Sequence, residues 1–225
     1  DGIRVIFKES KMEAALKFCA EVKKLGYKVF AQMVSVTTYT DEKLAEYAKL
    51  VNEVMPYATS MVDTYGLLDE EHLCHIYGIL DANLDPQIRV GYHAHNNFQL
   101  GYANAKHFLS LDSERGLLAD GTLYGMGKSA GNAPLELLLM FRNDKQGAGY
   151  HVTQALEAID NVIMEIYQRQ YWGYNLFYYI ASSMHCHPNY VSRLMNKRTL
   201  SVKQIRDILK TLDPAKSLLY DEAYI

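Results

Sequence analysis

Two histidines separated by one residue, His93 and His95, end a largely apolar run that begins at Ile88. Successive side chains of a β-strand point to opposite faces, so both imidazoles would project from the same face. Neutral imidazole is a common ligand of divalent metals, and a metal held here would need a further ligand. Oxygen ligands would favour manganese or magnesium. The spacing alone also fits a second interpretation, in which both histidines are hydrogen-bonded core residues.

A glycine-rich segment further along the chain adds to this pattern. Residues 91–97 read GYHAHNN, and residues 125–136 read GMGKSAGNAPLE. Together the two runs resemble the DRE-TIM metallolyases, the superfamily of hydroxymethylglutaryl-CoA lyase and isopropylmalate synthase. They are most similar to the 4-hydroxy-2-oxovalerate aldolases. The resemblance covers roughly residues 1–145.

The resemblance implies an activity and a cofactor. His93 and His95 would bind a divalent metal, with manganese expected first and magnesium as an alternative. The metal would stabilise the enolate that forms when a 4-hydroxy-2-oxo acid is cleaved to pyruvate and an aldehyde. The alternative is a Claisen-type acyltransferase of the isopropylmalate synthase kind, which condenses an acyl-CoA with a 2-oxo acid. No feature of the sequence marks a coenzyme A pocket, so cleavage is the prediction.

The same resemblance suggests further site residues. Thr64 occupies the serine position of a V-D-S-x-G run, where its hydroxyl would bind the substrate carboxylate or simply complete a turn. Tyr174 follows Gly173. In the aldolases a tyrosine after a glycine supplies a phenol near the catalytic base, so the resemblance makes Tyr174 a candidate for the same role. Asn132 would either bind the metal or support a ligand, or it would cap the following helix. Three further side chains would orient the ligands or bind the metal themselves: Asp63, Asn97 and Asp120. The loop glycines Gly125 and Gly127 could bind an anion through their amides.

Hydrophobic periodicity predicts five strand-then-helix units of about thirty residues, as in parallel βα architecture. The predicted strands are 3–7, 28–34, 59–62, 88–92 and 116–120. A TIM barrel is favoured over a doubly wound sheet, because the candidate residues follow the carboxyl ends of strands. Five units cannot close an eight-stranded barrel. By resemblance they correspond to strands four to eight, so we expect the N-terminal part of the barrel, with its metal-binding Asp and enolate-stabilising Arg, to be missing.

After residue 148 the strand and helix alternation gives way to helical patterns, which predicts a partial barrel over 1–148 and a helical domain over 149–225. The resemblance implies that this region packs by the active site and contacts an aldehyde dehydrogenase partner. An aromatic-rich stretch from Trp172 to Tyr179 suggests a homo-oligomer, most simply a two-fold dimer. Residues 188–206 also have the rhythm of a helix-turn-helix, but a solvated basic face is the favoured interpretation.

Composition narrows the class of protein. The 225 residues carry a formal charge of −3, which gives no general attraction to nucleic acids or anionic membranes. Three cysteines without C-x-x-C spacing suggest reduced thiols, and the sequence has no run long enough to span a membrane. A cytoplasmic protein is therefore expected. A nucleotide-binding P-loop is not expected, because its pattern requires a glycine at position 122, where this chain has Thr122.

Overall fold

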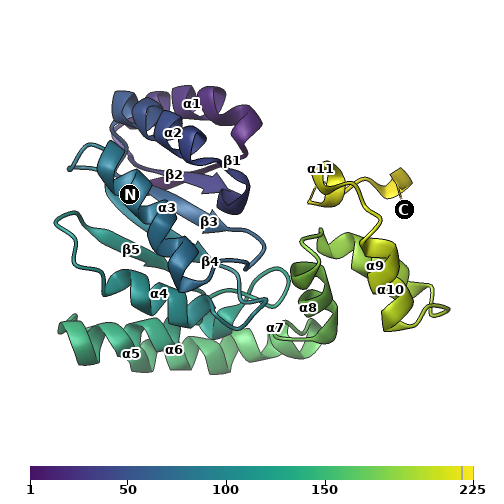
Figure 1. The fold of residues 1–225 in the computed structure, drawn as a ribbon. Coiled ribbons are helices and arrows are strands. Elements are labelled where there is room, and N and C mark those ends of the chain that lie inside the picture. The colour runs from purple at the N-terminus through teal and green to yellow at the C-terminus, as the bar shows by residue number, and fades with distance from the viewer. Residues whose placement is uncertain (219, 225) are drawn as a thin grey trace.

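The computed structural model describes residues 1–218 and 220–224, and its N-terminal part alternates strands with helices (Figure 1). The strands are β1 (Gly2–Phe7), β2 (Lys28–Val34), β3 (Ala58–Asp63), β4 (Arg89–Ala94) and β5 (Leu117–Asp120). The helices that follow them are α1 (Met12–Lys24), α2 (Asp41–Val54), α3 (Glu70–Asn83), α4 (Gly101–Leu109) and α5 (Leu135–Gln146). The five predicted units are confirmed.

All five strands are parallel, and each pairs with its neighbour in sequence, in the order β1-β2-β3-β4-β5. A doubly wound sheet would reverse its strand order, whereas a barrel does not. The sheet is strongly curved. The evidence is an ion pair between Arg4 of β1 and Asp120 of β5, which lie on the concave face at opposite edges of the sheet. Four strand spacings of about 4.8 Å would separate these strands by about 19 Å in a flat sheet. The sheet is thus an arc of a TIM-type barrel.

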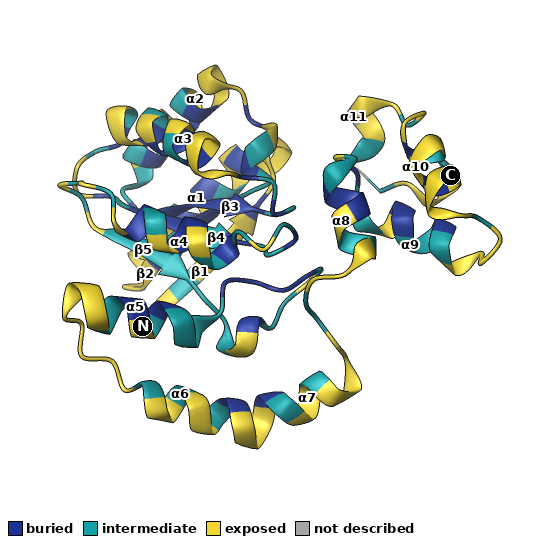
Figure 2. Ribbon diagram, turned by 60° about the horizontal axis from the view of Figure 1, so that its bottom comes forward, coloured by how far each residue is buried: buried dark blue, intermediate teal, exposed yellow. Residues whose placement is uncertain are grey.

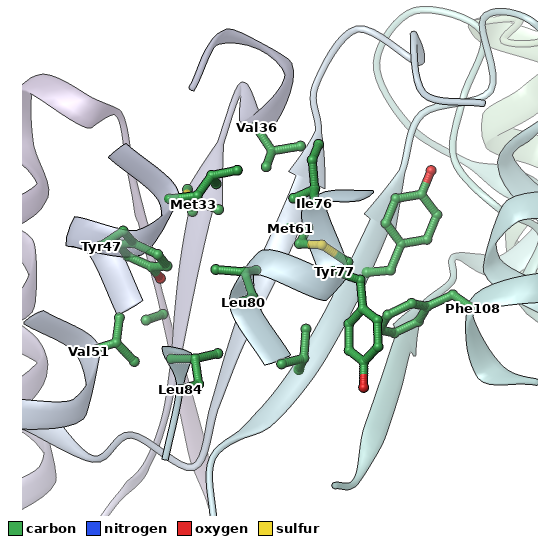
Figure 3. Packing of buried hydrophobic residues seen from close by; sticks show 14 of the residues in the cluster. Met33, Val36, Tyr47, Val51, Met61, Ile76, Tyr77, Leu80, Leu84 and Phe108 are labelled. Atoms are coloured by element: carbon green, nitrogen blue, oxygen red, sulfur yellow. The ribbon is translucent and has the colours of Figure 1, made fainter. Parts of the chain in front are cut away.

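The two faces of this arc differ in chemistry. Alternate residues of each strand, such as Ala31, Met33 and Met61, pack against the helices in a continuous apolar core (Figure 3). Helix residues such as Tyr47 and Leu80 complete this core and are fully buried. The intervening strand residues face the concave side, and several of them are polar: Arg4, Gln32, Ser60, His93 and Asp120. Period-two alternation therefore places the His-x-His pair on the side away from the helices.

The C-terminal part is helical, as predicted. It comprises α6 (Val152–Ala158), a π-helical segment (Ile159–Ile163), α7 (Met164–Arg169), α8 (Leu176–Ser183), α9 (Pro188–Asn196), α10 (Val202–Leu209) and α11 (Pro214–Ser217). Helices α8 to α11 lie apart from the sheet and have a small core of their own (Figure 2). The aromatic stretch differs from the prediction in one respect, because residues 172–175 precede α8 and are not helical. In the described part of the chain, no helix has the length and apolarity needed to cross a membrane.

Candidate active site

His93 and His95 lie at the carboxyl end of β4 with their ring centroids 5.4 Å apart. The Nδ1 atom of His93 is 3.0 Å from Oδ2 of Asp120, and Nδ1 of His95 is 3.3 Å from the carbonyl oxygen of Lys128. Both partners are hydrogen-bond acceptors, so a neutral imidazole at either position would carry its proton on Nδ1 and keep the lone pair of Nε2. Burial and the neighbouring His93 lower the pKa of His95 to about 4, so this imidazole is neutral at pH 7. In this tautomer an imidazole can bind a metal through Nε2.

Asp120 is the carboxylate that fixes the orientation of His93. Burial alone would raise the pKa of Asp120, but the hydrogen bond with His93 and the charge of Arg4 hold it below its ordinary value. The carboxylate is therefore ionised and can only accept hydrogen bonds. A residue that orients a ligand would make such a contact, and the role of Asp120 toward a metal site stays a prediction. Arg4 was not among the predicted site residues, although a charged residue at an alternate position of an apolar strand is a signal that could have identified it.

Asn132 lies beside His95, with which it forms an isolated antiparallel bridge. Its side chain is buried, and Nδ2 donates a 3.0 Å hydrogen bond to the carbonyl oxygen of Met126. The Oδ1 atom is also buried and has no hydrogen-bond partner in the described part of the chain. Leaving a buried acceptor unpaired costs about 1–3 kcal/mol, which a bound cation would offset. Asn132 is not the cap of α5, whose N-cap is Pro134, and its predicted role as a ligand stays a prediction.

The glycine-rich loop is folded closely around Asn132. A Cβ atom at Gly127 would clash with Nδ2 of Asn132, and a Cβ atom at Gly131 would clash with the carbonyl oxygen of Gly125. Gly125 and Gly131 also adopt positive φ angles of 63° and 87°. These positions require glycine because of backbone conformation and close approach. The predicted loop glycines, Gly125 and Gly127, therefore shape the Asn132 site.

The donor atoms present can be compared with those that the implied metal prefers. Two imidazole nitrogens and one amide oxygen form a mixed set that suits manganese, and oxygen ligands would complete it. Among residues 1–218 and 220–224, no group of three or more His, Cys, Asp and Glu side chains is arranged to hold a metal. The residues present fit part of a metal site, and the expectation that a further ligand lies on another strand stays a prediction.

Asp63 and Thr64 lie in the turn after β3, where both side chains bond to the backbone. The Oδ1 and Oδ2 atoms of Asp63 accept hydrogen bonds of 2.9 Å and 3.0 Å from the amides of Leu67 and Leu68. Asp63 is 1% exposed, and burial raises its pKa to about 6. The hydroxyl of Thr64 accepts a 2.7 Å hydrogen bond from the amide of Ser35. These contacts hold the turn, and roles toward metal or substrate stay predictions.

Asn97 connects three segments of the chain. Its Nδ2 donates to the carbonyl oxygen of Tyr65 at 2.9 Å and to the hydroxyl of Ser182 at 3.0 Å. Its Oδ1 accepts a 3.0 Å hydrogen bond from the amide of Ala130. Asn97 is 1% exposed, so it joins the β3 turn, the glycine-rich loop and α8 within the protein interior. The contacts of Asn97 are those of a structural clamp on the site loops.

The segment before α8 approaches the glycine-rich loop through Trp172. Its indole Nε1 donates a 2.9 Å hydrogen bond to the carbonyl oxygen of Tyr124, and its ring lies near Gly131. Tyr174, the predicted phenol, is 57% exposed and makes no hydrogen bond with the described residues. The structure thus brings Trp172 to the site loop, while the catalytic role of Tyr174 is an untested prediction.

Comparisons with known proteins identify the relatives of this arrangement. Residues 5–163 match the family model of HMGL-like proteins. The 4-hydroxy-2-oxovalerate aldolase of Pseudomonas putida is 30% identical over 115 residues, which are 51% of this chain and 31% of that protein. The solved N-terminal domain of a "putative aldolase" from Bacteroides vulgatus has a TM-score of 0.78 and 23% identity, covering 94% of this chain and 67% of that one. Hydroxymethylglutaryl-CoA lyase from Pseudomonas aeruginosa has a TM-score of 0.60 and 15% identity, covering 70% and 56%.

These matches confirm the resemblance to the DRE-TIM metallolyases and the barrel-type fold. The matched segments amount to between 31% and 43% of the length of the curated relatives. The chain therefore spans well under half of the proteins that it matches in sequence.

Proposed function

Because the chain belongs to the HMGL-like family, we propose that it forms part of a metal-dependent aldolase. Its substrate would be a 4-hydroxy-2-oxo acid similar to 4-hydroxy-2-oxovalerate, and its products pyruvate and an aldehyde. The proposal depends on one observation above all. His93 and His95 each form a hydrogen bond through Nδ1, and Asn132, which is bridged to His95, has a buried Oδ1 without a hydrogen-bond partner among the described residues. Sequence relatives named 4-hydroxy-2-oxovalerate aldolase support the choice of substrate.

The chain's own residues would prepare the site for this reaction. His93 and His95 would hold the metal, preferably Mn²⁺, and Asn132 would supply an oxygen. When bound, such an ion would polarise the 2-oxo group and stabilise the charge that develops on its oxygen during carbon–carbon cleavage. As acceptors at Nδ1, Asp120 would hold the proton of His93 there, and the Lys128 carbonyl would do the same for His95. Thr64 and Tyr174 are the residues we propose for substrate contact and proton transfer.

The reaction is tested with the full-length protein and manganese, by following pyruvate release in a coupled dehydrogenase assay. H93Q and H95Q should each lose most of the activity, whereas H75Q should retain it, because His75 lies on α3 and bonds to Asp41 of α2. Pyruvate that is consumed only when an acyl-CoA is supplied would contradict the proposal. That outcome would favour the acyltransferase alternative.

Metal binding is tested on the present chain by calorimetry with Mn²⁺. We expect weak binding that H95Q abolishes and H75Q leaves unchanged. Tight binding by this chain alone would mean that its own residues complete the site, in contrast to the expectation of a ligand on a further strand.

We also propose that the helical C-terminal region forms a two-fold dimer contact and the contact with an aldehyde dehydrogenase partner. Exposed apolar side chains support a contact here, among them Tyr171 at 74%, Val162 at 54% and Leu176 at 51%. Trp172 is a poor probe of such an interface, because it bonds to the site loop within the same chain. Light scattering should give a dimer mass for the wild type and a monomer mass for Y171S/L176S. A monomeric wild type at micromolar concentration would refute the dimer.

A further inference from the structure

Arg4 lies on β1, at the opposite edge of the sheet from Asp120 on β5, yet its guanidinium reaches that carboxylate. The same Oδ2 atom of Asp120 also lies 3.0 Å from Nδ1 of His93. One carboxylate oxygen therefore accepts from a guanidinium on one side and from an imidazole on the other. The three side chains form a continuous chain of contacts on the concave face.

A second contact fixes Arg4 itself. Its Nη2 donates a 3.0 Å hydrogen bond to Oε1 of Gln32, and Nε2 of Gln32 donates a 3.0 Å hydrogen bond to the hydroxyl of Ser60. Gln32 is 2% exposed and Ser60 is 3% exposed, so neither amide nor hydroxyl can exchange its partner freely for water. The guanidinium is thus held in place from β2 and β3, and its position is set by buried groups.

Asp120 needs this support, because it lies at the end of an edge strand with 27% of its side chain exposed. An Asp side chain so placed could rotate toward water, and His93 would then lose the acceptor that keeps its proton on Nδ1. The pairing of a charged guanidinium with the same oxygen opposes that rotation. Residues that hold the acceptor of a metal-binding histidine commonly alter metal affinity when they are replaced.

We infer that Arg4 is a positioning residue for the metal site. It holds the Asp120 carboxylate against Nδ1 of His93, so that Nε2 of His93 is unprotonated and faces the ligand position. The expected effect of Arg4 on metal affinity rests on the proposed function, since the site must bind a metal. The effect of Arg4 on the tautomer of His93 can be measured without metal and without activity.

The tautomer is measured first, by ¹⁵N NMR of the imidazoles in metal-free protein. The wild type should show His93 protonated at Nδ1, and R4Q should show both tautomers. R89Q is the matched control, because Arg89 lies on the same face of β4 but stacks on Tyr57, with its guanidinium carbon 4.2 Å from the ring centroid. R89Q should leave His93 unchanged. If R4Q does not fold, R4K serves instead and should shift the same signals to a smaller extent.

Calorimetry with Mn²⁺ then measures the consequence. R4Q should bind the metal about tenfold more weakly than the wild type, and R89Q should bind like the wild type. An R4Q variant that keeps both the Nδ1 proton and the wild-type affinity would overturn the inference. So would an unchanged tautomer with a raised KM for the 2-oxo acid, which would make Arg4 a substrate contact. A wild type that shows the Nδ1 tautomer but binds no manganese would count against the proposed function and leave the positioning of His93 by Arg4 intact.

Discussion

Replacing Asn97 by alanine should destabilise the protein by about 3 kcal/mol. The side chain makes three hydrogen bonds from a site that is 1% exposed, and each contributes about 1 kcal/mol net. The carbonyl of Tyr65 keeps a second partner, the hydroxyl of Ser182 at 3.1 Å. The amide of Ala130 would lose its acceptor, so most of the loss should come from the glycine-rich loop. A loss of this size is a large fraction of the typical 5–15 kcal/mol stability of a domain.

The change in unfolding free energy is measured by urea denaturation followed by circular dichroism. N96A is the matched control, because Asn96 is the neighbouring residue and its Oδ1 accepts one hydrogen bond, from the amide of Gly101 at 3.0 Å. We expect N96A to cost about 1 kcal/mol. Hydrogen exchange should also show faster opening of α8 in N97A. Equal losses in the two variants would refute the clamp role of Asn97.

Three further predictions concern other sites. The pKa of Asp63 is raised to about 6 in the folded protein, so protonated Asp63 favours folding. This stabilisation should be present below pH 4 and decline by up to about 3 kcal/mol as the pH rises through 6. Urea unfolding at a series of pH values should show the decline in the wild type and not in D63N. G127A should lose about 1–3 kcal/mol and bind manganese more weakly, because the new methyl group displaces Asn132, whereas G78A, in open space on α3, should lose nothing. Cys74 is the one cysteine that is not fully buried, so Ellman's reagent should modify one thiol in native protein and three after unfolding.

The sequence was sufficient for the parts of the fold that depend on local patterns. Alternating apolar residues predicted the strand that carries His93 and His95, and the structure places both rings together at its end. The ion pair of Arg4 with Asp120 could not be predicted in the same way. Those residues are 116 positions apart and meet only because the sheet curves through five strands. Pairwise spacing in sequence carries no measure of that curvature.

For the loop side chains, residue type indicated less about the role of a residue than its burial and hydrogen-bond partners did. Asn97 follows the His-x-His pair directly, which suggested a role beside the ligands. In the structure its side chain bonds to Tyr65, Ser182 and Ala130, and a role in orienting the ligands stays a prediction. Ser182 lies in the helical region, whose packing against the loops could not be derived from its own amphipathic pattern. Likewise, that Oδ1 of Asn132 is buried without a partner among the described residues becomes apparent only when its neighbours are known.

The neighbour-to-neighbour order of the strands has a consequence for how the chain folds. Each strand pairs with one about 30 residues away, as in the register of Val62, His93 and Asp120. Closing a loop of 116 residues instead of about 30 costs about 1.2 kcal/mol more in chain entropy. The sheet can therefore grow unit by unit, and the contact between Arg4 and Asp120 forms only after the intervening strands have docked. The ligand geometry at His93 would then be among the last features of this chain to appear during folding.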